Sequence, residues 1–171
     1  AELVMTSPPG AAEYYYNVTG MAFELQAYHG IAPYDVATSQ VFAYLPPLRE
    51  RAAPLNFFDI RASSSGILKY LLPSDFPPAL IAGLPFTADS LRYRVAVNSL
   101  ESVDAYGTMT IPDGSYSVLR QKRTAYRETR LDAKVPPLGW LDVTDIALQY
   151  GFAGLGVDTT VTFDFYNDVQ K

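Results

Sequence analysis

The chain has 171 residues, of which 49% are hydrophobic and 18% charged, a balance that excludes a disordered protein and fits one domain with a buried core. It has no cysteine, which excludes disulfides, cysteine-ligated metals and thiol nucleophiles, and its net charge of −5 gives no electrostatic reason to bind nucleic acid. No continuous apolar run reaches the roughly 18 residues of a spanning helix, and the N-terminal residues lack the basic and apolar parts of a signal peptide.

The first third of the chain is predicted to form strands separated by proline and glycine. Residues 1–12, which include a Pro-Pro-Gly sequence, are expected to be a loop. Residues 13–30 give two strand-like runs with alternating apolar side chains, and residues 34–47 give another that two prolines end. Residues 48–53, LRERAA, are the only charged stretch with some helical propensity, and they are too few for a stable helix on their own.

The middle of the chain contains the clearest alternation. Residues 55–62 and 66–73 are predicted as two strands joined by a Ser-Ser-Ser-Gly turn, and the prolines that follow predict an irregular segment. Residues 90–97 have an apolar face and a basic face, as expected for a strand that is buried on one side. The apolar face carries Leu91, Tyr93, Val95 and Val97, and the other face carries Arg92 and Arg94.

The last part of the chain predicts further strands and settles the fold class. Residues 103–111 and 115–123 flank a turn, and residues 139–151 and 159–167 are strand-like again. About ten to twelve short strands fit this length. We therefore predict an all-β, antiparallel two-sheet sandwich or jelly-roll-like fold with little or no helix, as a single domain over residues 1–171.

The turn between residues 103–111 and 115–123 has a strong local signal. Pro112 presets φ for the first turn position, Asp113 suits the second, and Gly114 supplies a positive φ at the third. This is the pattern of a three-residue hairpin closed by a glycine bulge.

The same hairpin carries a likeness to a known family. Residues 103–123 resemble a segment of the β-rich N-terminal domain of Bacteroidota secreted proteins, which carry a sorting domain for the type IX secretion machinery. The resemblance is strongest over residues 91–123 and extends from about residue 55 to the end. It implies a secreted or cell-surface location and a fragment of a longer chain, and its motif includes no catalytic residue. The matching positions are Gly107, Thr108, Pro112, Gly114, Tyr116, Val118, Leu119, Arg120 and Lys122.

Catalytic and metal signals are weak. His29 is the only histidine, and no nucleophile-elbow pattern accompanies it. Ca²⁺ is the one cofactor candidate, because aspartates could supply oxygen ligands for it. The same aspartates could instead form an acid/base pair. Their spacing matches no calcium loop and fits strand ends and turns better. Gly151, Gly154 and Gly156 have the wrong order for a phosphate loop. The aspartates concerned are Asp142, Asp145, Asp158, Asp164 and Asp168.

The basic segment, residues 120–134, is the strongest local charge asymmetry. Tyrosines beside it could stack on sugar rings while the cations meet an anionic partner. Alternatively, the cations lie on outward strand faces, where charge prevents unwanted strand pairing. The predicted ligand surface consists of Tyr116, Arg120, Lys122, Arg123, Tyr126, Arg127 and Arg130.

Three functions follow in order of preference. The first is a non-enzymatic structural or interaction module whose partners are other domains of the parent protein or surface proteins. The second is a carbohydrate-binding module that uses exposed tyrosines and residues 120–134. The third and weakest is a glycan-acting hydrolase whose carboxylates converge only in the folded chain.

Overall fold

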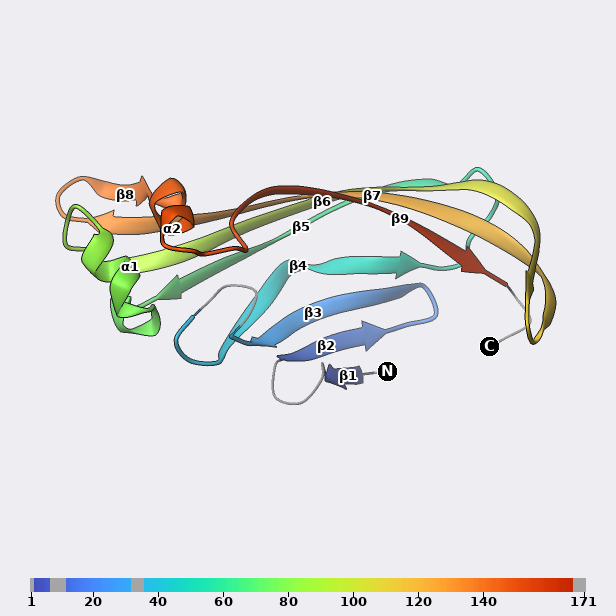
Figure 1. The fold of residues 1–171 in the computed structure, drawn as a ribbon. Coiled ribbons are helices and arrows are strands. Elements are labelled where there is room, and N and C mark those ends of the chain that lie inside the picture. Colours follow the sequence, from blue (N-terminus) through green and yellow to red (C-terminus); the bar gives the residue numbers. More distant parts are fainter. Residues whose placement is uncertain (1, 7–11, 32–35, 168–171) are drawn as a thin grey trace.

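The computed structural model describes residues 2–6, 12–31 and 36–167, which form two antiparallel sheets packed on each other (Figure 1). The predicted all-β sandwich is confirmed. The smaller sheet has the order β1-β2-β3-β4, and the larger has β5-β6-β7, with β8 and β9 both paired to β7. The smaller sheet consists of β1 (Glu2–Thr6), β2 (Ala12–Val18), β3 (Ala22–Gly30) and β4 (Gln40–Ala52).

The larger sheet holds the longest strands, and all helical structure in the described residues flanks it. Its strands are β5 (Ile60–Leu71), β6 (Ser90–Ile111), β7 (Gly114–Val135), β8 (Gly139–Asp142) and β9 (Gly156–Tyr166). The helical elements are the 3-10 helix η1 (Pro73–Asp75), α1 (Pro78–Gly83) and α2 (Thr144–Gln149). None of these helices has the length and apolar character needed to cross a membrane.

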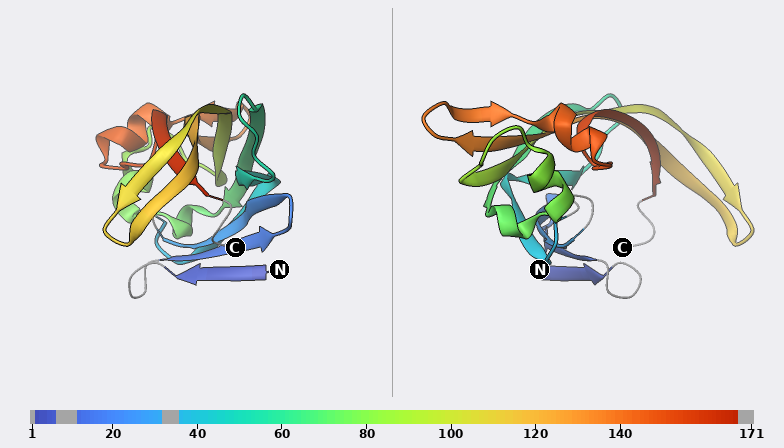
Figure 2. Two further views of the ribbon diagram at one scale, coloured as in Figure 1. Left: turned by 90° about the vertical axis from the view of Figure 1, so that its right-hand side faces the viewer. Right: turned by 60° about the vertical axis from the view of Figure 1, so that its left-hand side comes forward.

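The β6–β7 hairpin dominates the molecule. Each arm has 22 residues, so the predicted short strands merge into two long ones. The tip extends beyond the rest of the larger sheet (Figure 2). Its turn is one residue tighter than predicted, because Gly114 already pairs with Ile111 and only Pro112 and Asp113 remain in the loop. Gly114 has a φ of +152°, in agreement with the predicted need for glycine there.

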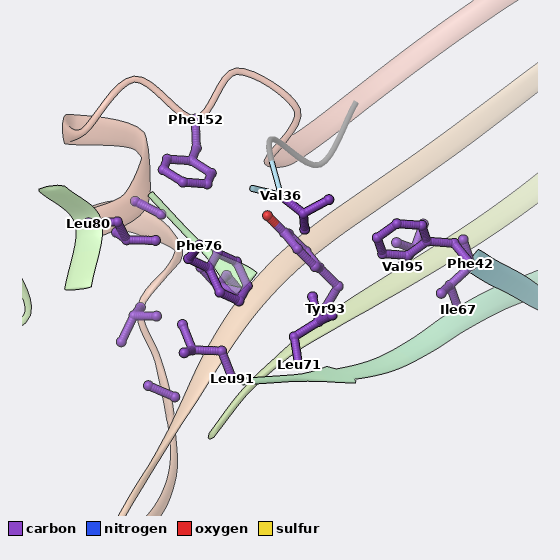
Figure 3. Close-up of a cluster of buried hydrophobic side chains, with 14 of the residues drawn as sticks. Val36, Phe42, Ile67, Leu71, Phe76, Leu80, Leu91, Tyr93, Val95 and Phe152 are labelled. Carbon is purple, nitrogen blue, oxygen red and sulfur yellow. The ribbon is translucent and has the colours of Figure 1, made fainter. Parts of the chain in front are cut away.

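The hydrophobic core lies at the helical end of the sandwich. The predicted apolar face of β6 is buried there, and Tyr93 is fully buried at its centre (Figure 3). Its ring meets Phe42 of β4 edge-on at 6.2 Å and Phe76 at 5.8 Å between ring centroids. These contacts join the two sheets to η1, α1 and α2.

Two local predictions were wrong. Residues 63–66 do not form a turn, because their serines bond across strands: Ser63 to Ser99 at 2.7 Å and Ser64 to Asn98 at 2.8 Å. Residues 48–53, predicted to be too few for a stable helix, indeed show no helix: residues 48–52 belong to β4, where Arg49 and Arg51 pair with β3. Residues 1–12, predicted as a loop, include β1 and the first residue of β2, while residues 1 and 7–11 lie outside the described part of the chain.

The predicted strand at residues 139–151 divides into β8 and α2. Asp142 accepts a hydrogen bond from the backbone N–H of Thr144 at 2.9 Å, which satisfies one free donor of the first helical turn. The side chains of Val143 and Ala147 are buried at a spacing of four residues. This spacing is helical, and the short strand pattern before it hides the change of period.

Candidate functional site

The described part of the chain contains a groove of about 950 Å³ at the end of the sandwich opposite the helices. Its floor comes from the start of β3 and the end of β4, and its walls come from both arms of the β6–β7 hairpin and the end of β9. Most of its surface is apolar, as is usual for binding sites. The lining includes Phe23, Arg51, Leu55, Tyr106, Val118, Leu119 and Tyr166.

Of the described residues that line the groove, Arg51 alone is charged. It pairs with Phe23 in the β3–β4 ladder, and its guanidinium lies 5.9 Å from the centre of that ring and 5.7 Å from the ring of Tyr166. Among the described residues it is the one arginine with no hydrogen-bonded or ion-paired partner. A guanidinium held between two rings keeps its donors available for an anionic group.

Tyr166 closes the groove at the end of β9. Burial raises the pKa of its hydroxyl, and the nearby carboxylate of Asp164 adds to this effect. The hydroxyl is buried and has no hydrogen-bond partner among the residues that the structure describes. A buried polar group without a partner is costly, so its position at a groove wall favours a ligand or water there.

One edge of the hairpin has no paired strand along the groove in the described part of the chain. The β7–β9 ladder ends where Leu119 pairs with Tyr166, and within the described residues 114–118 pair only with β6. Ser117 and Val118 from this unpaired edge line the groove. An unpaired edge presents backbone N–H and C=O groups that an added strand can use.

Aromatic residues support the opposite wall. Tyr106 of β6 is 72% exposed, and Phe57 packs against its ring at 4.9 Å in an edge-on arrangement. Phe58 has a φ of +69°, an unusual backbone conformation for a bulky side chain. The backbone N–H of Phe58 donates to the carbonyl of Val103 at 3.0 Å, which holds this loop beside the hairpin.

The structure divides the predicted ligand surface between two sheet faces. Alternation along β7 places Lys122, Tyr126 and the other even-numbered members on the outer face. Arg123 and Arg127 lie on the inner face, where they donate to backbone carbonyls of β4 and to the Tyr44 hydroxyl. The seven residues therefore lie on two faces of β7 and do not form one continuous patch. Whether any of them binds a ligand stays a prediction.

Both outward arginines of this segment are already paired. Arg120 donates to Asp104 at 2.9 Å, and Arg130 donates to Glu128 and Asp142 at 2.7 and 3.0 Å. Tyr116 is half-buried, and its hydroxyl donates to Asp113 at 3.1 Å in the hairpin turn. Tyr126, in contrast, is 39% exposed.

The other residues considered from the sequence do not come together. In the described part of the chain, no group of three or more histidine, cysteine or carboxylate side chains is placed to hold a metal ion, and Asp168 lies outside it. Asp142 caps α2 and pairs with Arg130, whereas Asp145 lies on α2 and Asp158 and Asp164 lie on β9. His29 lies 3.3 Å from Glu13 across the β2–β3 ladder.

Sequence reasoning missed the groove because its residues come from five separate segments. Arg51 belongs to the charged stretch 48–53, which was considered for helical propensity and not for binding. In the sequence, Tyr106 and Tyr166 look like ordinary strand residues. The one available signal was the presence of a charged run directly after an apolar strand.

Comparisons of the chain with protein families, with curated proteins and with solved structures found no match.

Proposed function

We propose that this domain is a non-enzymatic interaction module that binds an extended, mainly apolar segment of a protein partner in the groove. The observation that carries this proposal is the groove of about 950 Å³ that is bordered by an unpaired strand edge. The described lining residues include no carboxylate and no histidine. The groove therefore supports binding better than general acid/base catalysis.

The unpaired edge indicates the shape of the bound segment. Residues 114–118 offer about 17 Å of strand edge, at roughly 3.4 Å for each residue. A partner segment that extends the sheet here would lie in line with β9 and make backbone hydrogen bonds to β7. Every second side chain of the segment would then enter the groove, where Tyr106 and its cross-strand partner Leu119 offer apolar contacts.

Arg51 indicates the charge of the bound segment. Its guanidinium has no carboxylate partner in the described residues, although the chain carries five more negative than positive charges. A carboxylate on the partner segment would supply this partner. Hydrogen bonds between charged groups contribute about 1.5–3 kcal/mol, which makes Arg51 the main source of selectivity between acidic and neutral segments.

The proposed setting is a secreted or cell-surface protein of a Bacteroidota bacterium. The support is the family resemblance, whose strongest part, residues 91–123, supplies both hairpin arms of the groove. The partner would be another domain of the same parent protein or a neighbouring surface protein. Cleavage of the native protein by proteinase K added to intact cells tests the location, and full protection would contradict it.

Two matched peptides test the binding function. Fluorescein-labelled VTVEVTV and VTVQVTV differ only in the charge of the central side chain, and anisotropy measures their affinity. We expect the acidic peptide to bind the native domain about tenfold more tightly than the neutral one, which corresponds to about 1.4 kcal/mol.

Variants of the domain identify the cation that is responsible. Arg51→Gln should abolish the preference for the acidic peptide, whereas Lys134→Gln, which removes an equal charge at the far end of β7, should keep it. Equal affinity of the native domain for both peptides, or no binding of either, would contradict the proposal.

A further inference from the structure

A second cavity, of about 270 Å³, lies between β4 and the strands β7 and β9. It shares no lining residue with the groove. Its polar lining consists of Glu50, Arg123, Arg127, Asp158, Thr160 and Thr162. The last three residues are exposed on β9, so the cavity is open to solvent along that strand.

Glu50 is the least satisfied of these groups. Its half-buried carboxylate has no hydrogen-bonded or ion-paired partner among the residues that the structure describes. Burial raises the pKa of this carboxyl, although the positive charge of Arg123, Arg51 and Arg127 opposes the shift. A carboxylate in this position gains from any ligand that donates hydrogen bonds to it.

The two arginines are fixed by the strand opposite them. Arg123 donates to the backbone carbonyls of Glu50 and Arg49, both at 3.3 Å. Arg127 donates to the Tyr44 hydroxyl at 3.0 Å through one terminal nitrogen, which leaves its other terminal nitrogen and Nε as donors. The cations are thus held in place before any ligand arrives, which reduces the entropy lost on binding.

The lining combines two guanidinium groups with two carboxylates and two threonine hydroxyls. Its formal charges cancel, so a strongly charged ligand gains little from it. Donors and acceptors alternate over a short distance, which matches neighbouring hydroxyl groups, since each hydroxyl both donates and accepts. The volume corresponds to roughly nine water molecules of about 30 Å³, enough for one six-membered ring with hydroxyl substituents.

We propose that this cavity binds a neutral polyhydroxylated ring, such as one sugar unit of a glycan. Glu50 and Asp158 accept hydrogen bonds from neighbouring hydroxyls, and Arg127 donates to them. Thr162 does both, whereas the Thr160 hydroxyl, which already donates to Asp158 at 3.3 Å, accepts. The site is independent of the groove and of the proposed protein partner. It uses the two inward-facing cations of the basic segment, Arg123 and Arg127, and no tyrosine.

Nuclear magnetic resonance on the native domain tests this site directly. Methyl α-D-mannopyranoside, methyl β-D-galactopyranoside and myo-inositol are the probes, and cyclohexanol, a ring with one hydroxyl, is the control ligand. We expect at least one probe to bind with a dissociation constant of about 1 mM and to shift the amide signals of Thr160 and Thr162. Cyclohexanol should leave these signals unchanged.

Matched variants then identify the responsible groups. Glu50→Gln and Thr160→Val should each weaken binding by about fivefold or more, as expected when one hydrogen bond is lost. Thr159→Val, which makes the same change on the opposite face of β9, should leave the affinity as it is. If Glu50→Gln does not fold, the amide shifts of the native domain and the affinities of Thr160→Val and Thr159→Val test the site.

Three results would overturn the inference. The first is that no probe shifts the amide signals at a concentration of about 10 mM, which is ten times the expected dissociation constant. The second is an equal response to cyclohexanol, which would show that neighbouring hydroxyls are not recognised. The third is a response confined to groove residues such as Tyr106, or an equal loss in the two threonine variants.

Discussion

Replacing Asp132 by asparagine tests whether the cations on the outer face of the larger sheet serve the fold. Asp132 is 2% exposed although it lies on that face, because Arg92 and Arg94 cover it. Arg92 Nε donates to it at 2.7 Å, and Arg94 donates through Nε and Nη2 at 2.5 and 2.8 Å. Arg92 also stacks on Trp140, with 4.3 Å between its guanidinium carbon and the ring centre.

The stability lost in Asp132→Asn depends on how well Arg92 and Arg94 are solvated or hydrogen-bonded in the variant. Removing one member of a buried ion pair costs about 3–5 kcal/mol when the other charge stays buried. Here the side chains of Arg92 and Arg94 are 21% and 42% exposed, so water solvates them again, and asparagine still accepts one neutral hydrogen bond. We therefore expect a loss of about 2–3 kcal/mol, or roughly 5–10 °C in Tm for a domain of this size.

The loss should also depend on pH. Burial alone would raise the pKa of Asp132, but hydrogen bonds from Arg94 and Arg92 outweigh this and lower it. The native state therefore gains stability from Asp132 above the unfolded pKa of about 3.9, and this gain disappears as the pH falls through the lower folded value. Urea unfolding from pH 7 to pH 3 should show the native chain and Asp132→Asn converging at low pH.

The control is Asp104→Asn, an equal substitution on the same sheet. Asp104 accepts from Arg120 at 2.9 Å, but both side chains are well exposed, and exposed pairs contribute little to stability. An equal shift in Tm for the two variants, or no shift for Asp132→Asn, would refute the reasoning.

Two further predictions concern the interior of the larger sheet. Glu101→Gln should raise the free energy of unfolding at pH 7, because burial raises the pKa of this carboxyl despite the positive charge of Arg123. The native chain therefore loses stability as the pH rises through that raised value. Urea unfolding at pH 5 and pH 7 checks this prediction, and a variant less stable than the native chain at pH 7 would contradict it. Gly66→Ala should destabilise by about 1–3 kcal/mol, because its Cβ would lie 2.6 Å from the carbonyl oxygen of Val95. Gly107→Ala, whose Cβ would meet nothing within 4 Å, should change Tm little, and equal effects of the two alanines would show that the close approach is unimportant.

Much of the fold could be predicted because its signals are local. The alternation from Leu91 to Val97 predicts a half-buried strand, and the side chains on the apolar face are indeed buried. The Pro-Asp-Gly sequence predicts the hairpin, since few residues other than glycine adopt the positive φ of Gly114. These features depend on neighbours in the sequence, so no tertiary information is needed.

The failures have a common physical cause, which is that a partner far away in the sequence decides the local structure. Ser63 and Ser64 look like turn residues, and only Ser99 and Asn98 on β6 convert them into strand residues. Likewise no strand pattern is visible around Arg51 in LRERAA, and only the pairing with β3 makes this residue part of β4. Contacts of this kind are invisible to a pattern read along one segment.

The candidate site was out of reach for the same reason. Its binding groups are Arg51 on β4, the unpaired edge of β7 and Tyr166 on β9, which the sandwich brings to one end. The basic segment was visible in the sequence, but its division between an outer face and an inner cavity depends on which strand lies opposite. Sequence therefore predicted the charges and not their surroundings.

Hydrogen exchange of the native domain with and without the VTVEVTV peptide tests the central claim most directly. If the peptide extends the larger sheet in the groove, backbone amides within residues 114–118 should exchange more slowly, because a second strand now pairs with them. Amides of residues 91–97, which pair on both sides, should not change. Binding without slower exchange at residues 114–118, or protection confined to the outer face of the sheet, would contradict the account.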